Sequence, residues 1–210
     1  EKEIRALSQW YQSNLRQLPW RQTTDPYAIW ISETMLQQTT SVGVLPYYEK
    51  FMQLFPTLSD LAKAPLEKVL EAWSGLGYYS RARNLHQCAQ KLNELQEFPQ
   101  TWQELITYPG IGPYTARAIS SLAFAQKAGV LDGNVIRILS RYYNLSLPWW
   151  KTKDRQTLQS LADKIVAQGT PSVLNQAMME LGATLCRPLS PYCHLCPIAR
   201  GCQAKKWQSQ

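Results

Sequence analysis

The chain has 210 residues, of which 45% are hydrophobic and 11% aromatic, enough to bury one sizeable core or two small lobes that share a cleft. Its formal charge of +7 and pI near 9.2 favour polyanionic partners such as nucleic acid. The start, EKEIRALSQWYQS, lacks the apolar region of a secretory signal, and no later apolar run is long enough to span a bilayer. We therefore expect no membrane partner and an intracellular protein that is not secreted, cytoplasmic and nucleoid-associated if bacterial.

The stretch 25–39 predicts a helix that carries an acid among apolar residues. Asp25 supplies a capping oxygen and Pro26 is tolerated at the first helical position. The helical neighbours of the acid at three and four positions are Ile29, Trp30, Leu36 and Gln37. Glu33 could lie at the edge of the core with its carboxylate in water, or be a desolvated acid with a raised pKa that donates a proton near neutral pH. This stretch alone leaves both readings open.

Helical periodicity continues along the chain, with no convincing strand alternation, and predicts an all-α protein. Two apolar helical faces are Leu66, Val69, Leu70 and Trp73, and Leu85, Cys88, Ala89, Leu92 and Leu95. Two basic stretches, YYSRARNLHQCAQK (78–91) and the chain from Cys186 onward, contain no Asp or Glu. Each could be a solvated face, but on a basic protein both together indicate phosphate contacts.

The segment LITYPGIGPYTARAIS, residues 105–120, predicts a helix–hairpin–helix. Its glycines, Gly110 and Gly112, would place backbone N–H groups at a helix N-terminus, where an incoming phosphate meets no side chain. A Gly-x-Gly alone is most often only a tight turn. In the following segment VLDGNVIRILSRYY, Asp132 precedes an apolar helix, and the simplest interpretation of this aspartate is a helix N-cap.

The cysteines near the C-terminus have the spacing C-x6-C-x2-C-x5-C, whereas Cys88 lies alone in an apolar face. The four spaced cysteines are Cys186, Cys193, Cys196 and Cys202. Disulfides are not expected without a secretory signal. Zinc would accept four thiolates, but its usual sites use two short knuckles, whereas a [4Fe–4S] cluster suits four thiolates from one wrapped loop. We therefore predict a [4Fe–4S] cluster, with zinc as the alternative.

These motifs resemble the endonuclease III superfamily of DNA glycosylases and, within it, the MutY-type adenine DNA glycosylases. The resemblance covers LPWR (18–21), SETMLQQT (32–39), GLGYYSRARNLH (75–86), PGIGPYTA (109–116), LDGNV (131–135), NQAMMELGA (175–183) and the cysteine loop (186–202). It implies a two-lobed, all-α helix-hairpin-helix glycosylase fold with catalytic residues in a cleft. Residues 21–128 would form a six-helix barrel lobe, and 1–20 plus 129–210 an iron–sulfur cluster lobe.

The implied activity is base-excision repair by a monomer that acts on double-stranded DNA containing adenine mispaired with 8-oxoguanine or guanine. By the resemblance, Glu33 protonates N7 of the flipped adenine, and Asp132 stabilises or transiently bonds the sugar cation. Tyr114 and Asn134 orient these groups. The resemblance also implies DNA or base contacts by Trp20, Arg21, Leu36, Gln37, Gln38, Tyr78, Arg81, Gly110 and Gly112. Phosphate contacts near the cluster are expected from Arg187, Arg200, Lys205 and Lys206.

The sequence also departs from relatives within this superfamily. The endonuclease III branch cuts the strand with a lysine where this chain has Tyr114, and some MutY relatives have a lysine where this chain has Ile136. The resemblance therefore implies a monofunctional glycosylase that stops at the abasic site. Many MutY-type proteins carry a C-terminal domain that recognises 8-oxoguanine, and since no residue follows Gln210 we expect the catalytic part alone.

Two alternatives remain for the activity. A thymine-mismatch branch of the superfamily also uses tyrosine and aspartate, so a thymine-mismatch or oxidised-pyrimidine glycosylase of the same fold is one alternative. A non-catalytic iron–sulfur DNA-binding module is the other. Loss of one carboxylate would indicate that module, and both Glu33 and Asp132 are present.

Overall fold

A computed structural model describes residues 2–204, and in this part of the chain every regular element is a helix. The all-α prediction is confirmed. The chain divides into two compact units, one formed by Gln17–Phe124 and the other by the residues up to Arg16 together with those from Ala125 onward. Their interpretation as a six-helix barrel lobe and a cluster lobe stays a prediction. Among the residues described, no helix is long and apolar enough to cross a membrane.

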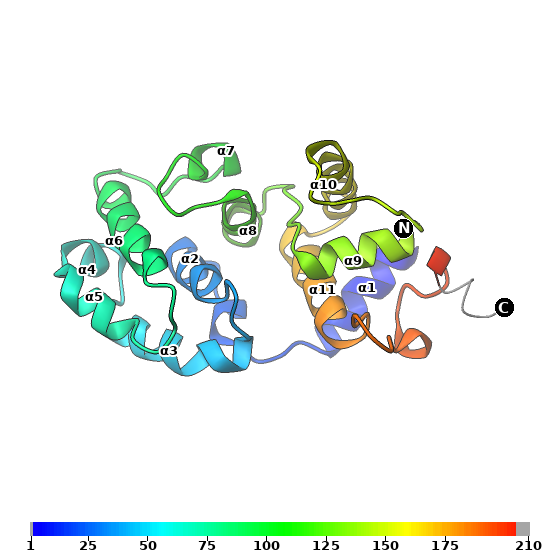
Figure 1. Cartoon of the computed structure of the whole chain (residues 1–210), viewed down its shortest axis with the longest axis horizontal. Helices are drawn as coiled ribbons and strands as arrows, with labels where there is room; N and C mark the ends of the chain where they lie inside the picture. The colour runs from blue at the N-terminus through cyan, green and yellow to red at the C-terminus, as the bar shows by residue number, and fades with distance from the viewer. Residues whose placement is uncertain (1, 205–210) are drawn as a thin grey trace. The chain divides into compact units, whose positions relative to one another are not determined.

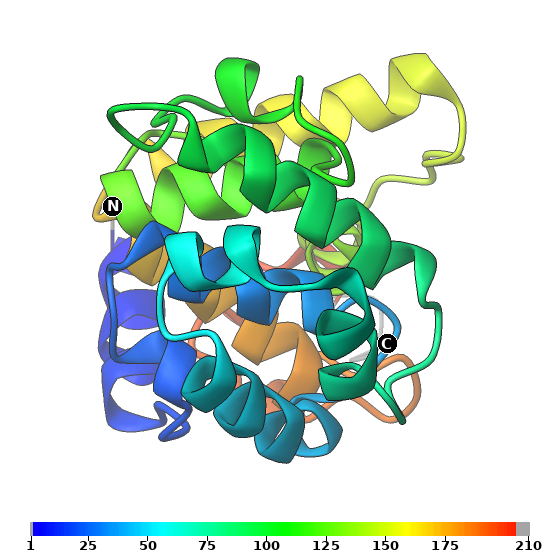
Figure 2. The same cartoon turned by 90° about the vertical axis from the view of Figure 1, so that its left-hand side faces the viewer.

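The unit Gln17–Phe124 is built around α2. Its elements are η1 (Pro19–Arg21), α2 (Pro26–Met35), α3 (Ser41–Leu54), α4 (Leu58–Lys63), α5 (Leu66–Ala72), α6 (Ser80–Asn93), α7 (Trp102–Leu105) and α8 (Pro113–Phe124). Every residue of α2 from Tyr27 to Met35 is buried, and α2 packs against α3 and α8 (Figure 2). A helix that is buried on all sides belongs to the centre of a core.

The local signals at α2 and α6 largely behave as predicted. The Asp25 carboxylate accepts a hydrogen bond from the Tyr27 backbone N–H at 3.0 Å, and Pro26 is the first helical residue. The apolar face of α6 is buried against α4 and α5. Leu95 is the exception, because α6 ends at Asn93 and leaves that side chain 42% exposed.

The other unit contains the remaining helices, labelled in Figure 1 except for η2. They are α1 (Lys2–Ser13), α9 (Gly133–Tyr142), α10 (Thr152–Val166), α11 (Pro171–Thr184) and η2 (Cys193–Leu195). Helix α11 packs against α1, α9 and α10. Its core gathers apolar side chains from all four α-helices, among them Leu7, Leu139, Leu158 and Leu181. The chain segments before Arg16 and after Ala125 thus share one core.

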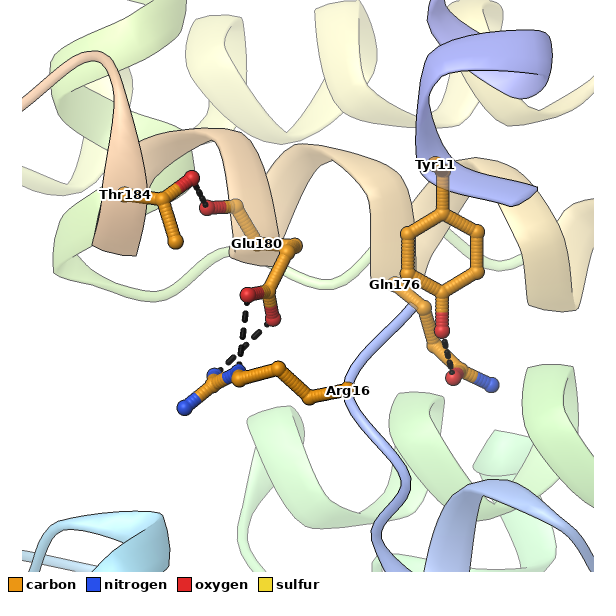
Figure 3. Close-up of polar contacts among 5 residues, drawn as sticks. All are labelled: Tyr11, Arg16, Gln176, Glu180 and Thr184. Atoms are coloured by element: carbon orange, nitrogen blue, oxygen red, sulfur yellow. Dashed lines mark hydrogen bonds and ion pairs between the residues drawn. The ribbon is translucent and has the colours of Figure 1, made fainter. Parts of the chain in front are cut away.

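An ion pair joins the end of the first segment of this unit to α11 (Figure 3). The Arg16 guanidinium donates from Nη2 to Glu180 Oε2 at 2.9 Å, and its Nε lies 2.7 Å from Oε1. Glu180 is 1% exposed and the Arg16 side chain 41%. Two parallel contacts of this kind fix orientation as well as charge, so the pair anchors the chain where it leaves this unit.

We expect Arg16→Met to lower the free energy of unfolding by about 2 kcal/mol, because the Glu180 carboxylate stays buried and loses the guanidinium. Methionine keeps much of the aliphatic part of the arginine side chain. The decrease in the free energy of unfolding therefore measures the loss of the ion pair rather than a loss of packing. Urea unfolding measures it. The control Arg5→Met changes an exposed arginine of α1 and should shift stability by less than about 0.5 kcal/mol. Equal shifts for both variants would contradict the anchoring role.

Candidate functional site

Glu33 lies in the last turn of α2 and is 4% exposed. The helix buries it together with Ile29 and Trp30 on the preceding turn, which are also buried. Of the two readings that the sequence leaves open, this burial excludes a carboxylate bathed in water. The carboxyl group of Glu33 is therefore shielded from water.

The residues after α2 lead from the core to the surface. Gln37 donates from Nε2 to Thr115 Oγ1 at 3.3 Å, a long contact that links the end of α2 to the first turn of α8. Tyr114, beside Thr115, is half-buried. Gln38 is exposed and has φ of 63°, a left-handed conformation unusual for a residue with a side chain. Leu36, half-buried, is the C-cap residue of α2.

A second exposed residue in a left-handed conformation precedes α6. Tyr78 has φ of 48° and is 65% exposed, directly after Gly77 with φ of 70°. Its side chain is thus presented at the surface by a tight turn of the backbone. Arg81, three residues later, is half-buried and donates to main-chain carbonyls of the protein.

Two further predicted base contacts lie in η1. Trp20 is buried and packs edge-to-face on Tyr48 of α3, with ring centroids 5.0 Å apart. Arg21 is half-buried. Both therefore belong to the same unit as Glu33, Gln38, Tyr78 and Tyr114.

The predicted hairpin has the backbone that the sequence implies. Gly110 has φ of +79°, and a Cβ built there would lie 2.7 Å from Asn84 Cβ. A Cβ at Gly112 would meet nothing within 4 Å, and α8 begins at the next residue. Both glycines are exposed. The turn before α8 is therefore open toward solvent at Gly112 and closely packed at Gly110.

Asp132 is the N-cap of α9, as its simplest interpretation predicts. Its Oδ1 accepts from the Val135 backbone N–H at 2.7 Å, and its Oδ2 accepts from Asn134 Nδ2 at 3.0 Å. Both carboxylate oxygens of Asp132 therefore have a hydrogen-bond donor at the start of α9. The Asn134 amide thus donates to the carboxylate that, by the resemblance to MutY-type glycosylases, it would orient.

Arg137 and Gly182 support this carboxylate and were not predicted from the sequence. Arg137 donates from Nη2 to Asn134 Oδ1 at 2.8 Å and to the Gly182 carbonyl at 2.8 Å. It also donates from Nε to the Cys186 carbonyl at 2.8 Å. A Cβ at Gly182 would lie 2.5 Å from Asn134 Cβ. The first turn of α9 is thereby held against the end of α11 and the start of the cysteine loop.

The four spaced cysteines, Cys186, Cys193, Cys196 and Cys202, line one cavity of about 60 Å³. None of the five cysteines, including the buried Cys88, forms a disulfide bond. Burial, with the neighbouring three cysteines adding to it, raises the pKa of the Cys196 thiol to about 11. Within residues 2–204 no group of three or more His, Cys, Asp or Glu side chains is arranged to hold a single metal ion.

One arginine lines this cysteine cavity, and a second stacks on a tyrosine that lines it. Arg141 Nη1 lies 3.5 Å from Cys186 Sγ, and Arg187 stacks on Tyr192 with its guanidinium carbon 4.1 Å from the ring centroid. Arg200 is exposed. The predicted phosphate contacts Lys205 and Lys206 lie outside the described residues. Two positively charged side chains, those of Arg141 and Arg187, therefore lie close to the cavity that the four cysteines line.

Comparisons with known proteins show which proteins this chain is similar to. Residues 31–175 match the family of HhH-GPD superfamily base excision DNA repair proteins. The human adenine DNA glycosylase is 44% identical over 214 residues, which cover 96% of this chain but only 39% of that protein. The chain thus spans about two fifths of the length of that relative.

Two solved structures share the fold. A thermostable thymine-DNA glycosylase superposes with a TM-score of 0.87 at 28% identity, over 97% of this chain and 95% of that one. An endonuclease III trapped as a covalent intermediate with DNA superposes with a TM-score of 0.79 at 23% identity, over 99% of this chain and 95% of that one. The identity to endonuclease III is low enough that this second similarity concerns the fold alone.

Proposed function

The chain belongs to the HhH-GPD superfamily of base excision DNA repair proteins, and from this premise we propose that it is a monofunctional adenine DNA glycosylase. It would act as a monomer on intracellular duplex DNA and hydrolyse the N-glycosidic bond of adenine opposite 8-oxoguanine or guanine. The similarity to the human adenine DNA glycosylase along nearly the whole chain supports this substrate.

The observation that carries the proposal is the burial of Glu33. Adenine is a poor leaving group as an anion, and protonation of a ring nitrogen makes it a better one. A carboxyl group that is 4% exposed within an all-buried helix is suited to hold that proton and deliver it. We assign this proton transfer, to N7 of the base, to Glu33.

The complementary role belongs to Asp132. The sugar develops positive charge as the glycosidic bond breaks, and a fixed anion lowers the energy of that cation. The hydrogen bonds from Val135 and Asn134 orient the Asp132 carboxylate. Adenine leaves with the proton from Glu33, water adds to the sugar cation and gives up a proton that restores Glu33, and the product is an abasic site.

We further propose that the reaction stops at this product. A lyase of this superfamily needs an amine that attacks the sugar, and the two positions where relatives carry a lysine are Tyr114 and Ile136. Neither side chain can form a Schiff base. Strand breaks should therefore appear only after alkali is added.

The experiment that tests the proposal compares duplexes with adenine opposite 8-oxoguanine, adenine opposite guanine, thymine opposite guanine, and adenine opposite thymine as the control. Base release is followed with and without alkali. Release of adenine from the first two, with strand breaks only after alkali, supports the proposal. Release of thymine would favour the alternative suggested by the thymine-DNA glycosylase similarity, and binding without release would leave a non-catalytic module.

We also propose that Cys186, Cys193, Cys196 and Cys202 hold a [4Fe–4S] cluster. The donor set fits, because four thiols from one loop line a single cavity and an arginine lies against one of them. The four thiols would bind the cluster as thiolates, so binding would release their protons. Bound there, the cluster would supply structural cross-linking of the loop.

Replacing Cys196 with Ser should reduce iron content, visible absorbance and folding yield together, because one of four ligands is lost. Iron analysis and the absorbance spectrum of the purified protein measure this. The matched control is Cys88→Ala, which removes the buried thiol of α6 and should keep the iron of the parent protein. Stoichiometric zinc without iron in a fully active parent would contradict the cluster.

The two hairpin glycines allow a paired test of DNA contact. Gly110→Ala should lower the free energy of unfolding by roughly 1–3 kcal/mol, since its φ of +79° and the nearby Asn84 both oppose a Cβ. Gly112→Ala should leave stability nearly unchanged, yet both variants should weaken duplex binding if phosphate approaches this backbone. Thermal unfolding and duplex titrations separate the two effects. Parental duplex binding by Gly112→Ala would argue against a phosphate site there.

A further inference from the structure

Arg81, in the first turn of α6, reaches the end of α2. Its Nη1 donates to three carbonyls in and just after the last turn of that helix: Thr34 at 2.9 Å, Met35 at 3.2 Å and Gln37 at 2.8 Å. Carbonyls at a helix C-terminus have no partner within the helix, and a cation there also complements the helix dipole. Arg81 therefore caps the helix that carries Glu33.

The other arm of the guanidinium holds the loop before α6. Its Nη2 donates to the carbonyls of Leu76 at 3.2 Å and Gly77 at 3.3 Å. The guanidinium carbon lies 5.3 Å from the Trp73 ring centroid and 5.7 Å from that of Tyr78. One side chain thus connects the end of α2 to the loop that presents Tyr78, both within the unit Gln17–Phe124.

The residues next to these two contacts have unfavourable backbone conformations. Gln38 follows Gln37 and has φ of 63°, and Tyr78 follows Gly77 and has φ of 48°. Non-glycine residues occupy this region at a cost, and they stay there only where the surroundings hold them. The carbonyl immediately before each strained residue is bound by Arg81.

We propose that Arg81 is a positioning residue, which holds Gln38 and Tyr78 in their left-handed conformations so that both side chains enter the duplex, and that it is not a phosphate contact. The entry of the Gln38 and Tyr78 side chains into a duplex rests on the function proposed above. The restraint of their backbone conformations by Arg81 does not. The resemblance to MutY-type glycosylases places Arg81 among the DNA contacts, but its guanidinium points into the protein.

The Arg81 guanidinium is partly buried, and most of its donors already have partners within the protein. Burial lowers the pKa of its guanidinium, and the nearby Tyr78 acts in the opposite direction. A cation that is already bound by five main-chain carbonyls has few donors left for a phosphate. A lysine keeps the charge but lacks the planar fork that reaches two backbone segments at once.

The first test needs no DNA. Hydrogen exchange of the backbone amides in 36–40 and 75–80 is compared among the parent, Arg81→Lys, Arg81→Met and the controls Arg83→Lys and Arg83→Met, which change an exposed arginine of the same helix. Both Arg81 variants should exchange roughly ten-fold faster in both segments, and the Arg83 variants like the parent. Parental exchange in Arg81→Lys would overturn the proposal. If Arg81→Met does not fold, Arg81→Lys carries the test.

The second test separates positioning from phosphate contact. A lost phosphate contact lowers the slope of log Kd against log salt by about 0.9, and lysine should restore it. Positioning instead predicts a parental slope for both Arg81 variants, with a smaller fluorescence change from 2-aminopurine beside the target adenine and slower single-turnover release in both. A reduced slope in Arg81→Met that Arg81→Lys restores would overturn the proposal. Failure of the parent to release adenine would reject the proposed function while leaving the exchange result decisive.

Discussion

Glu33→Gln is expected to lower the single-turnover rate of adenine release by at least roughly 10²- to 10⁴-fold, the contribution typical of general acid catalysis. The amide has nearly the shape of the carboxylic acid, but it cannot deliver a proton to the leaving base. Because Glu33 is 4% exposed, the variant should not lose a contact that a duplex makes from outside, and duplex binding should stay within a few-fold of the parent.

The matched control is Glu71→Gln, which makes the same chemical change at an exposed residue of α5 in the same unit. Its rate and affinity should equal those of the parent. Single-turnover release and equilibrium binding are measured on the same duplex and at one salt concentration, since phosphate contacts make affinity depend on salt. Release by Glu33→Gln at close to the parental rate would show that another group supplies the proton.

The burial of Glu33 also marks the limit of what the sequence could predict. Asp25 and Pro26 define where α2 starts, and the helix begins there. The neighbours of Glu33 along one helix follow from spacing, but its exposure depends on α3 and α8, which pack against α2 from later parts of the chain. Periodicity along one helix carries no information about such tertiary contacts.

The arginines illustrate a second limit. A basic stretch indicates charge, and the resemblance to MutY-type glycosylases implied a DNA contact for Arg81, which lies in such a stretch. Whether a guanidinium points to solvent or to main-chain carbonyls depends on the tertiary fold, which decides whether the C-terminus of another helix, such as α2, lies within its reach. Arg137 was missed for a similar reason, since its partners include Gly182 and Cys186, more than forty residues away. Its spacing of three residues from Asn134 was the one local signal available.

The hairpin and the cysteine loop were easier to predict because their signals are local. Gly110 has a positive φ, and the tight turn in which it lies favours glycine at that position whatever packs around it. Four cysteines within seventeen residues must lie near one another in almost any compact fold. Such features depend little on distant packing, which is why the sequence predicted their position.

The second large effect is expected for Asp132→Asn, which should lower adenine release by roughly 10²- to 10³-fold, the scale seen when one electrostatic stabiliser of a transition state is lost. Asparagine is as good an N-cap as aspartate, and its oxygen can still accept from the Val135 N–H. The variant therefore removes a negative charge and the acceptor of Asn134 Nδ2 but keeps the cap at the start of α9, so the free energy of unfolding should fall by no more than about 1.5 kcal/mol.

Asp25→Asn is the matched control, because Asp25 is the N-cap of α2 and accepts from Tyr27 N–H as Asp132 does from Val135. The same substitution thus removes a carboxylate charge at the start of α2 and at the start of α9. Only the carboxylate of Asp132 is proposed to stabilise the sugar cation. If Asp132 were only a cap, both variants would release adenine at parental rates and the proposed role would be wrong. If it stabilises the cation, only Asp132→Asn loses activity, and urea unfolding shows that both variants are folded under the assay conditions.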